Sequence, residues 1–175
     1  MTEKKLAAGA KFPVLSLPVV AGRDIVLGDA GQLEDRWQLI VIYRGKHCPI
    51  CKQYLATLEE LKSEFAAEDI DVIAVSGDSL EKAKAQVNEG SLTFPVAYNL
   101  KLDQMSELGL YISDPRSPEE TDRPFAEPAL FAVRPDGRVQ IIDISNAPFA
   151  RPDLKAILKG LKFVRAKSYP VRGTH

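Results

Sequence analysis

The sequence predicts an α/β domain, a three-layer sandwich in which helices cover both faces of a central mixed sheet. Three short apolar runs have the composition of buried parallel strands: residues 39–43, 70–75 and 130–133. Helical patterns follow the first two runs, and this strand-helix-strand-helix order is typical of a parallel crossover unit. The third run leads through a turn with Pro and Gly into an alternating run at residues 138–144, which predicts an antiparallel hairpin.

Length and composition fit one domain over residues 1–175. Of the 175 residues, 45% are hydrophobic and 27% are charged, as in ordinary globular domains. The 23 basic and 24 acidic side chains give a formal net charge of −1, which offers no reason to expect nucleic acid or a membrane as partner. Residues 1–11 lack the apolar core of a signal peptide, and no apolar run approaches the roughly 20 residues that span a bilayer. We therefore expect a cytoplasmic protein.

The helices are predicted by their apolar spacing and by their first residues. Residues 49–66 carry apolar side chains at intervals of three and four, and Pro49 suits the first helical position. Ser79 can cap a second helix that ends near residues 88–90. A last helix is expected over about residues 151–165.

The remaining segments belong to the margins of the fold. Residues 14–20 and 24–27 have the character of edge strands, and Pro18 in the first of them is tolerated only at an edge or a bulge. Residues 113–128 contain four prolines and several charges without apolar periodicity, which predicts a long surface loop. Edge strands and an exposed loop also allow a homodimer.

The two cysteines lie where the first strand passes into the first helix. Only two residues separate Cys48 from Cys51, and in a reducing compartment such a pair is more often redox-active or metal-binding than structural. A helix N-terminus favours a thiolate, and Arg44, Lys46 and His47 add positive charge, so the pKa of Cys48 should fall from about 8.5 to roughly 3.5 to 7.5. Cys51, one turn further on, could then attack a mixed disulfide or a sulfenic acid on Cys48.

Other interpretations of these residues stay open. Cys48, Cys51 and His47 supply three potential zinc ligands, but the only other histidine is His175 and a structural zinc site needs four ligands, so no metal is expected. Two inert cysteines in the start of a helix would instead indicate a non-enzymatic binding domain. His47 is either an exposed residue that tunes Cys48 or a general base. Asp78, after the second strand, is either a proton acceptor or a helix cap.

The segment around the cysteines resembles the active site of a known family. Residues 43–55, Tyr-Arg-Gly-Lys-His-Cys-Pro-Ile-Cys-Lys-Gln-Tyr-Leu, are similar to that of the peroxiredoxin-like (AhpC/TSA, redoxin) branch of the thioredoxin superfamily. Residues 94–96, before a short helix, and residues 127–137, a strand-turn-strand, share the resemblance, which covers most of the chain. It implies a thioredoxin-like fold and an antioxidant, thiol-dependent oxidoreductase that reduces disulfides or hydroperoxides.

Two departures from the family's pattern concern the roles of individual residues. Peroxiredoxins of the main type carry Thr-x-x-Cys with the peroxide-attacking cysteine last, so Cys48 falls on the threonine and Cys51 on that cysteine. We expect an exposed Cys48 to attack and Cys51 to resolve; the alternative, a true thiol peroxidase, reverses the two. Pro128 falls where peroxidases keep an arginine and where thioredoxin-like reductases keep a cis-proline. We therefore predict a cis peptide between Glu127 and Pro128, with Pro128 shaping a substrate groove.

The resemblance also implies what the reaction needs. Arg44 or Arg123 could replace the missing arginine. No cofactor is expected, but an external thiol reductant must return the disulfide to two thiols. The expected partners are thus a hydroperoxide or disulfide substrate and an electron donor of the thioredoxin or glutathione type, with no nucleic acid and no membrane.

Overall fold

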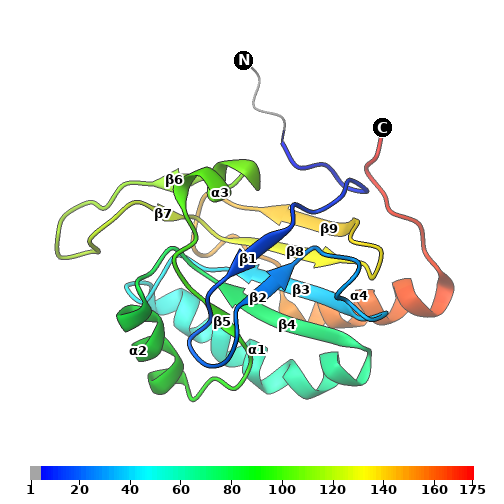
Figure 1. Ribbon diagram of the computed structural model, residues 1–175, viewed down its shortest axis with the longest axis horizontal. Helices are drawn as coiled ribbons and strands as arrows, with labels where there is room; N and C mark the ends of the chain where they lie inside the picture. Colours follow the sequence, from blue (N-terminus) through cyan, green and yellow to red (C-terminus); the bar gives the residue numbers. More distant parts are fainter. Residues whose placement is uncertain (1–4) are drawn as a thin grey trace.

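The central sheet is the framework of the computed structural model, which describes residues 5–175. Its five strands lie in the order β5-β4-β3-β8-β9 (Figure 1). β3 pairs parallel with β4 and antiparallel with β8, so the sheet is mixed, as predicted. The strands are β3 (Trp37–Ile42), β4 (Ile70–Val75), β5 (Val96–Ala97), β8 (Ala129–Val133) and β9 (Val139–Ile144).

Four helices follow within the described residues, and the first two start where the sequence indicates. They are α1 (Pro49–Ala67), α2 (Leu80–Gly90), α3 (Leu102–Glu107) and α4 (Leu154–Lys167). Ser79 caps α2 by accepting a hydrogen bond from the Lys82 N–H. The last helix begins slightly later than predicted, because Asp153 is its cap and accepts from the Ala156 N–H at 2.9 Å. Arg151 and Pro152 therefore precede α4.

β3 separates two apolar cores, which explains the apolar run of residues 39–42 within it. All six of its residues are buried. Leu39 and Val41 belong to the core under α1 and α4, whereas Ile40 and Ile42 belong to the core on the opposite face. Figure 1 shows α1 and α4 side by side on the first of these faces. The predicted three layers, with a thioredoxin-like arrangement of sheet and helices, are thus confirmed.

Two marginal segments differ from their predictions. The two N-terminal strands, β1 (Leu15–Leu17) and β2 (Ile25–Leu27), pair with each other in a separate antiparallel sheet instead of extending the edge of the central sheet. The predicted surface loop is instead part of a long hairpin, because β6 (Ile112–Ser113) pairs with β7 (Phe125–Ala126). Both residues of β7 are buried, and only residues 114–124 project from the body of the molecule (Figure 1).

The prediction of a cis peptide before Pro128 is wrong, since the residues described contain no cis peptide bond. The chain passes through this point in a strand-like path rather than a turn. The Glu127 N–H donates to the carbonyl of Tyr111 at 2.8 Å, and the Ser145 N–H donates to the carbonyl of Pro128 at 2.9 Å. Pro128 therefore links β7 to β8 in an extended conformation.

The structure bears on the prediction about membrane-spanning segments, but not fully on the prediction about a signal peptide. No helix within residues 5–175 combines the length and apolar character needed to cross a bilayer. The N-terminal stretch predicted to lack a signal core begins with residues 1–4, which lie outside the described residues.

Candidate active site

Cys48 and Cys51 lie at the start of α1, just beyond the carboxyl end of β3. Cys48 is the N-cap of α1, and its Sγ accepts a hydrogen bond from the Cys51 N–H at 3.3 Å. The sulfur thereby takes the place that a serine or aspartate oxygen usually has at a helix start. This position is where open α/β sheets place their functional sites, and it agrees with the placement predicted from the sequence.

Both cysteines are free thiols, and neither is exposed. Cys48 is 1% exposed and Cys51 is 0% exposed. The expectation of an exposed Cys48 is therefore wrong. The physical reason is that Cys48 belongs to the apolar core between the sheet and α1, although the charged side chain of Arg44 also lies beside its sulfur.

The two thiols have opposite acidities. The pKa of Cys48 is lowered to about 5, first because the Cys51 thiol donates a hydrogen bond to it, and further because the Cys51 N–H and the Arg44 guanidinium stabilise its negative charge. The pKa of Cys51 is raised, because its proton is held by Cys48 and because the thiol is buried. The negative charge of the pair thus resides on Cys48 at neutral pH.

Arg44 is held beside Cys48 by the hairpin. Its Nε lies 2.9 Å from Glu127 Oε2, and its guanidinium lies 4.9 Å from the centre of the Phe125 ring. Glu127 is buried, and its other oxygen accepts a hydrogen bond from the Ser113 hydroxyl at 2.7 Å. Arg44 therefore occupies a fixed position as the positive charge next to Cys48, as the sequence predicted.

His47 does not supply the positive charge predicted for it. Its ring is half-buried and packs edge-on against Phe125, with centroids 4.5 Å apart. Burial, followed by the nearby Arg44 charge, lowers the pKa of His47, so the imidazole is neutral at pH 7. Neither ring nitrogen has a hydrogen-bond partner among the described residues. His47 is thus an uncharged side chain that lines the site.

Asp78 fixes the loop between β3 and α1. Its Oδ2 accepts a hydrogen bond from the Lys46 N–H at 2.8 Å, while Ser79 serves as the cap of α2. Gly45 makes this approach feasible: its φ is +144°, and a Cβ there would lie 2.7 Å from Asp78 Oδ1. Burial raises the pKa of Asp78. The aspartate is therefore a structural anchor of the loop rather than a helix cap.

Arg151 is the site residue that sequence reasoning missed. Its Nη2 donates a hydrogen bond to Cys51 Sγ at 3.1 Å, and its Nε donates to the carbonyl of Pro148 at 2.7 Å. The guanidinium also lies 4.7 Å from the centre of the Tyr54 ring. The sequence gives no sign of this contact, because its pattern places Arg151 in the first turn of the last helix.

Two other residues predicted to belong to the site, Arg123 and Pro128, make no hydrogen bond with either cysteine sulfur within the described part of the chain. Arg123, proposed as a substitute for the missing arginine, binds Asp122 at 3.1 Å and is directed to Gly77 and Asn99 rather than to a sulfur. Pro128 adjoins Ala129, which pairs with Ile42 at the end of β3, and so lies close to the loop that carries the cysteines. Pro128 is itself buried, and its part in a substrate groove stays a prediction.

Two hollows in the surface flank the cysteine pair. One, of about 340 Å³, lies on the Cys51 side and is lined by Ile50, Tyr54, Phe149 and Arg151 among others. A second, of about 480 Å³, lies on the Cys48 side and is lined by Lys46, His47, Lys82, Arg116, Glu119 and Glu120. Neither cysteine lines either hollow, so both hollows lie beside the pair without opening onto a sulfur.

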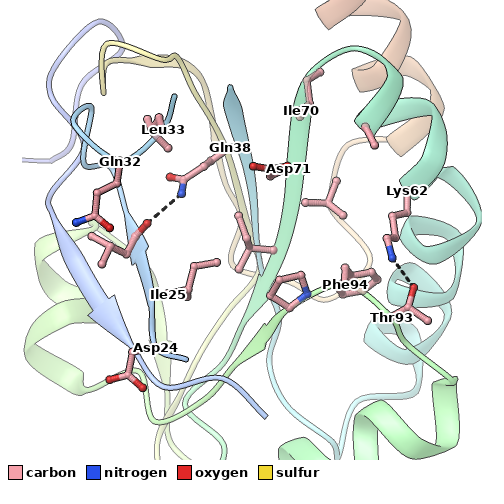
Figure 2. A pocket seen from close by; sticks show the side chains of 15 residues that line it. Asp24, Ile25, Gln32, Leu33, Gln38, Lys62, Ile70, Asp71, Thr93 and Phe94 are labelled. Atoms are coloured by element: carbon pink, nitrogen blue, oxygen red, sulfur yellow. Dashed lines mark hydrogen bonds between the residues drawn. The ribbon is translucent and has the colours of Figure 1, made fainter. Parts of the chain in front are cut away.

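A further hollow at the other end of the sheet has none of this chemistry. It measures about 450 Å³ and lies beside β2 and β4 (Figure 2). Its buried amide, Gln38, accepts from the Gly28 N–H and donates to the Val26 carbonyl, both at 3.0 Å. Lys62 donates to the Thr93 hydroxyl at 2.6 Å. No cysteine or histidine lines it, so the cysteine pair remains the candidate site.

A model of the AhpC/TSA family matches residues 8–142. This chain belongs to the AhpC/TSA family. The chain is similar to alkyl hydroperoxide reductase C of Mycolicibacterium smegmatis, with 24% identity over 162 residues that cover 83% of this chain and 78% of the relative. Peroxiredoxin-6 of Sus scrofa is 26% identical over 119 residues, which cover 62% of this chain and 52% of that protein. The family assignment confirms the expected enzyme class, a thiol-dependent oxidoreductase.

Solved structures from the family share the fold. A cysteine-to-serine mutant of Peroxiredoxin 6 from Arenicola marina superposes with a TM-score of 0.78 at 17% identity, covering 94% of this chain and 76% of that one. A peroxiredoxin-like protein from Aquifex aeolicus has a TM-score of 0.76 at 18% identity, covering 92% and 89%. The thioredoxin-like fold predicted from the sequence is confirmed.

Proposed function

We propose that this protein reduces hydroperoxides or disulfides by cycling Cys48 and Cys51 between two thiols and one disulfide. The observation that carries the proposal is the charge distribution of the pair: the pKa of Cys48 is lowered to about 5, and Cys51 holds the proton. A thiolate, not a thiol, is the nucleophile, so Cys48 is ready to react at neutral pH.

The first step is attack by the Cys48 thiolate. With a hydroperoxide, the sulfur takes the distal oxygen, the O–O bond breaks, and an alcohol or water leaves once the departing oxygen is protonated. With a disulfide, a mixed disulfide forms and one thiolate leaves. Arg44 is positioned to stabilise the thiolate, taking the part that an arginine at the position of Pro128 plays in the main-type family members. Pro128 is proposed to shape the groove beside it.

The second step is attack by Cys51 on the sulfur of Cys48. Cys51 lies one helical turn behind Cys48, and its N–H already contacts that sulfur at 3.3 Å. The products are an internal disulfide and either water or a second thiolate. An external thiol of the thioredoxin or glutathione type then restores both thiols, so the proposed cycle uses no metal or organic cofactor.

Burial of both sulfurs favours a small hydroperoxide as the first substrate. Cys48 is 1% exposed, so any substrate needs the groups that cover the sulfur to move, and a small hydroperoxide needs a smaller movement than a protein disulfide. The name of the Mycolicibacterium smegmatis relative, alkyl hydroperoxide reductase C, supports the same substrate class. We further propose one domain over residues 1–175, a cytoplasmic location, no nucleic-acid or membrane partner, and a homodimer as an accessible assembly.

The reverse order of attack has one observation in its favour. Arg151 contacts Cys51 Sγ at 3.1 Å, so a positive charge is available for a Cys51 thiolate as well. In this alternative Cys51 attacks the peroxide and Cys48 resolves. Trapping separates the two orders: Cys51→Ser should form sulfenic acid at position 48 under the proposed order, whereas Cys48→Ser should form it at position 51 under the reverse order.

The experiment that tests the function is stopped-flow oxidation of the reduced protein. Hydrogen peroxide, an organic hydroperoxide and a model disulfide are compared, and we expect a hydroperoxide to react fastest, with formation of the Cys48–Cys51 disulfide. Thiol pKa values near 8.5 or above at both positions, with no disulfide on mild oxidation, would instead identify a binding domain with inert cysteines.

A further inference from the structure

Arg151 is fixed against Cys51 by three contacts that we call the arginine clamp. Its Nη2 reaches Cys51 Sγ at 3.1 Å, its Nε donates to the Pro148 carbonyl at 2.7 Å, and its guanidinium lies 4.7 Å from the centre of the Tyr54 ring. The segment that carries it is tied to α1 independently, because the Tyr54 hydroxyl donates to the Pro152 carbonyl at 2.6 Å. The clamp therefore directs a permanent positive charge at one particular sulfur.

The clamp contributes little that α4 needs. Asp153 caps α4 without help from Arg151, and the Tyr54 to Pro152 hydrogen bond holds the segment in place. Arg151 Nη1 is moreover buried without a hydrogen-bond partner among the described residues. A buried donor of this kind needs an explanation, and a negative charge that arises only during the reaction provides one.

Such a charge must arise on Cys51 once Cys48 has reacted. In the reduced protein the thiol proton of Cys51 is held by the Cys48 thiolate, which is the first reason for the raised pKa of Cys51. After Cys48 becomes a sulfenic acid, this anionic acceptor no longer exists, and Cys51 must lose its proton to become a nucleophile. The titratable or charged groups that face Cys51 are then Tyr43 from the end of β3, Arg44 from the following loop, and Arg151.

We propose that Arg151 is a positioning residue for the second step, and that it stabilises the Cys51 thiolate after Cys48 has been oxidised. The proposal rests on the proposed function, in which Cys48 attacks first. In this step the Cys51 thiolate attacks the Cys48 sulfur, an S–S bond forms as the S–O bond breaks, and the leaving hydroxide takes up a proton as water. Cys51 is oxidised and the sulfenic sulfur is reduced to the disulfide level.

The two steps give Arg44 and Arg151 separate duties. Arg44 contacts the sulfur that is anionic before the substrate arrives, whereas Arg151 contacts the sulfur that becomes anionic afterwards. Loss of Arg151 should therefore leave sulfenic acid formation unchanged and slow disulfide formation. A charge-assisted hydrogen bond of this type corresponds to a change of about tenfold or more in the rate of the second step.

The test is a rapid-quench experiment with hydrogen peroxide on the full-length reduced protein. Each sample is quenched with an alkylating agent and with dimedone, and intact mass then separates dithiol, sulfenic acid and disulfide. In Arg151→Met we expect sulfenic acid to form at the wild-type rate and to accumulate, with disulfide formation slowed about tenfold or more and its pH midpoint shifted upward. Arg151→Lys, which keeps the charge without the planar fork, should recover part of the rate.

Controls keep the outcomes distinct. Arg165→Met removes an arginine that pairs with Glu68 and Asp69, remote from the cysteines, and should leave both steps unchanged. An unchanged first step in Arg151→Met shows that this variant is folded. If its second step also keeps the wild-type rate and pH midpoint, the role of Arg151 is refuted alone. If neither wild type nor Cys51→Ser forms sulfenic acid at Cys48, the proposed function itself fails.

Discussion

Cys48 and Cys51 are one helical turn apart, yet the two sides of the site that surround them are built differently. On the Cys48 side, Arg44 is paired with the buried carboxylate of Glu127 at 2.9 Å, so its charge is partly compensated. On the Cys51 side, Arg151 donates to the sulfur itself and to a backbone carbonyl. The comparison teaches that the low pKa of Cys48 depends first on the hydrogen bond from the Cys51 thiol, and only after that on the charge of Arg44.

The largest expected effect separates the two sulfurs themselves. Cys48→Ser should lower peroxide consumption by about a thousandfold or more, because a serine hydroxyl is not ionised at neutral pH and its nucleophilic role is lost. Cys51→Ser should keep the first oxidation of each chain but form no internal disulfide. Peroxide consumption and mass spectrometry check both outcomes, and full activity of Cys48→Ser together with an inactive Cys51→Ser would reverse the comparison.

A smaller effect is expected on the pH dependence of the first step, which Arg44 influences. Because the thiolate is the reactive form and the pKa of Cys48 is about 5, the rate of the first step should rise with pH through about 5 and be level at neutral pH. Replacing Arg44 by Met removes a stabilising charge, so this midpoint should move up by about one pH unit or more.

Arg44→Met also leaves Glu127 as a buried carboxylate without its ion pair, which could disturb folding. The matched variant Arg44→Met with Glu127→Gln removes both charges and should show the same shift of the pH–rate midpoint. A midpoint that stays near 5 in the double variant would mean that the partner thiol and the helix start alone account for the acidity of Cys48. The measurement is the stopped-flow rate with hydrogen peroxide as a function of pH.

The smallest expected effect lies on the Arg151 side. Tyr54→Phe removes the hydroxyl that donates to the Pro152 carbonyl at 2.6 Å and should lower the free energy of unfolding by about 1 kcal/mol. Urea denaturation of the reduced protein measures it. Tyr111→Phe, at an exposed tyrosine, is the control and should change the stability little. An equal loss in both variants would show that the hydrogen bond does not hold the segment to α1.

The parts of the fold that the sequence predicts correctly are mostly those that local residue patterns determine. The strand cores and the start of α1 follow from apolar runs and from Pro49, which depend only on neighbouring residues. The prediction of N-terminal edge strands differs from the structure because pairing partners are not encoded in a single strand's composition. The composition of residues 113–128 predicts a surface loop, but β7 within this segment is buried and pairs with β6.

In the site, as in the fold, the sequence predicts the features that depend on neighbouring residues and not those that depend on distant contacts. The position of the cysteine pair and the proximity of Arg44 follow from adjacent residues. The contact between Arg151 and Cys51 joins positions 100 residues apart, and no local pattern indicates it. The neutral state of His47 likewise depends on burial against Phe125, which comes from the distant hairpin.

The position of Cys48 as the N-cap of α1 also bears on how strongly the protein oxidises its reductant. The hydrogen bond from the Cys51 N–H and the contact with Arg44 are strongest when Cys48 carries a negative charge, and a sulfur in a disulfide carries none. These contacts therefore stabilise the reduced form over the oxidised form. A dithiol stabilised in this way has a higher reduction potential, so the internal disulfide should be readily reopened by a mild thiol.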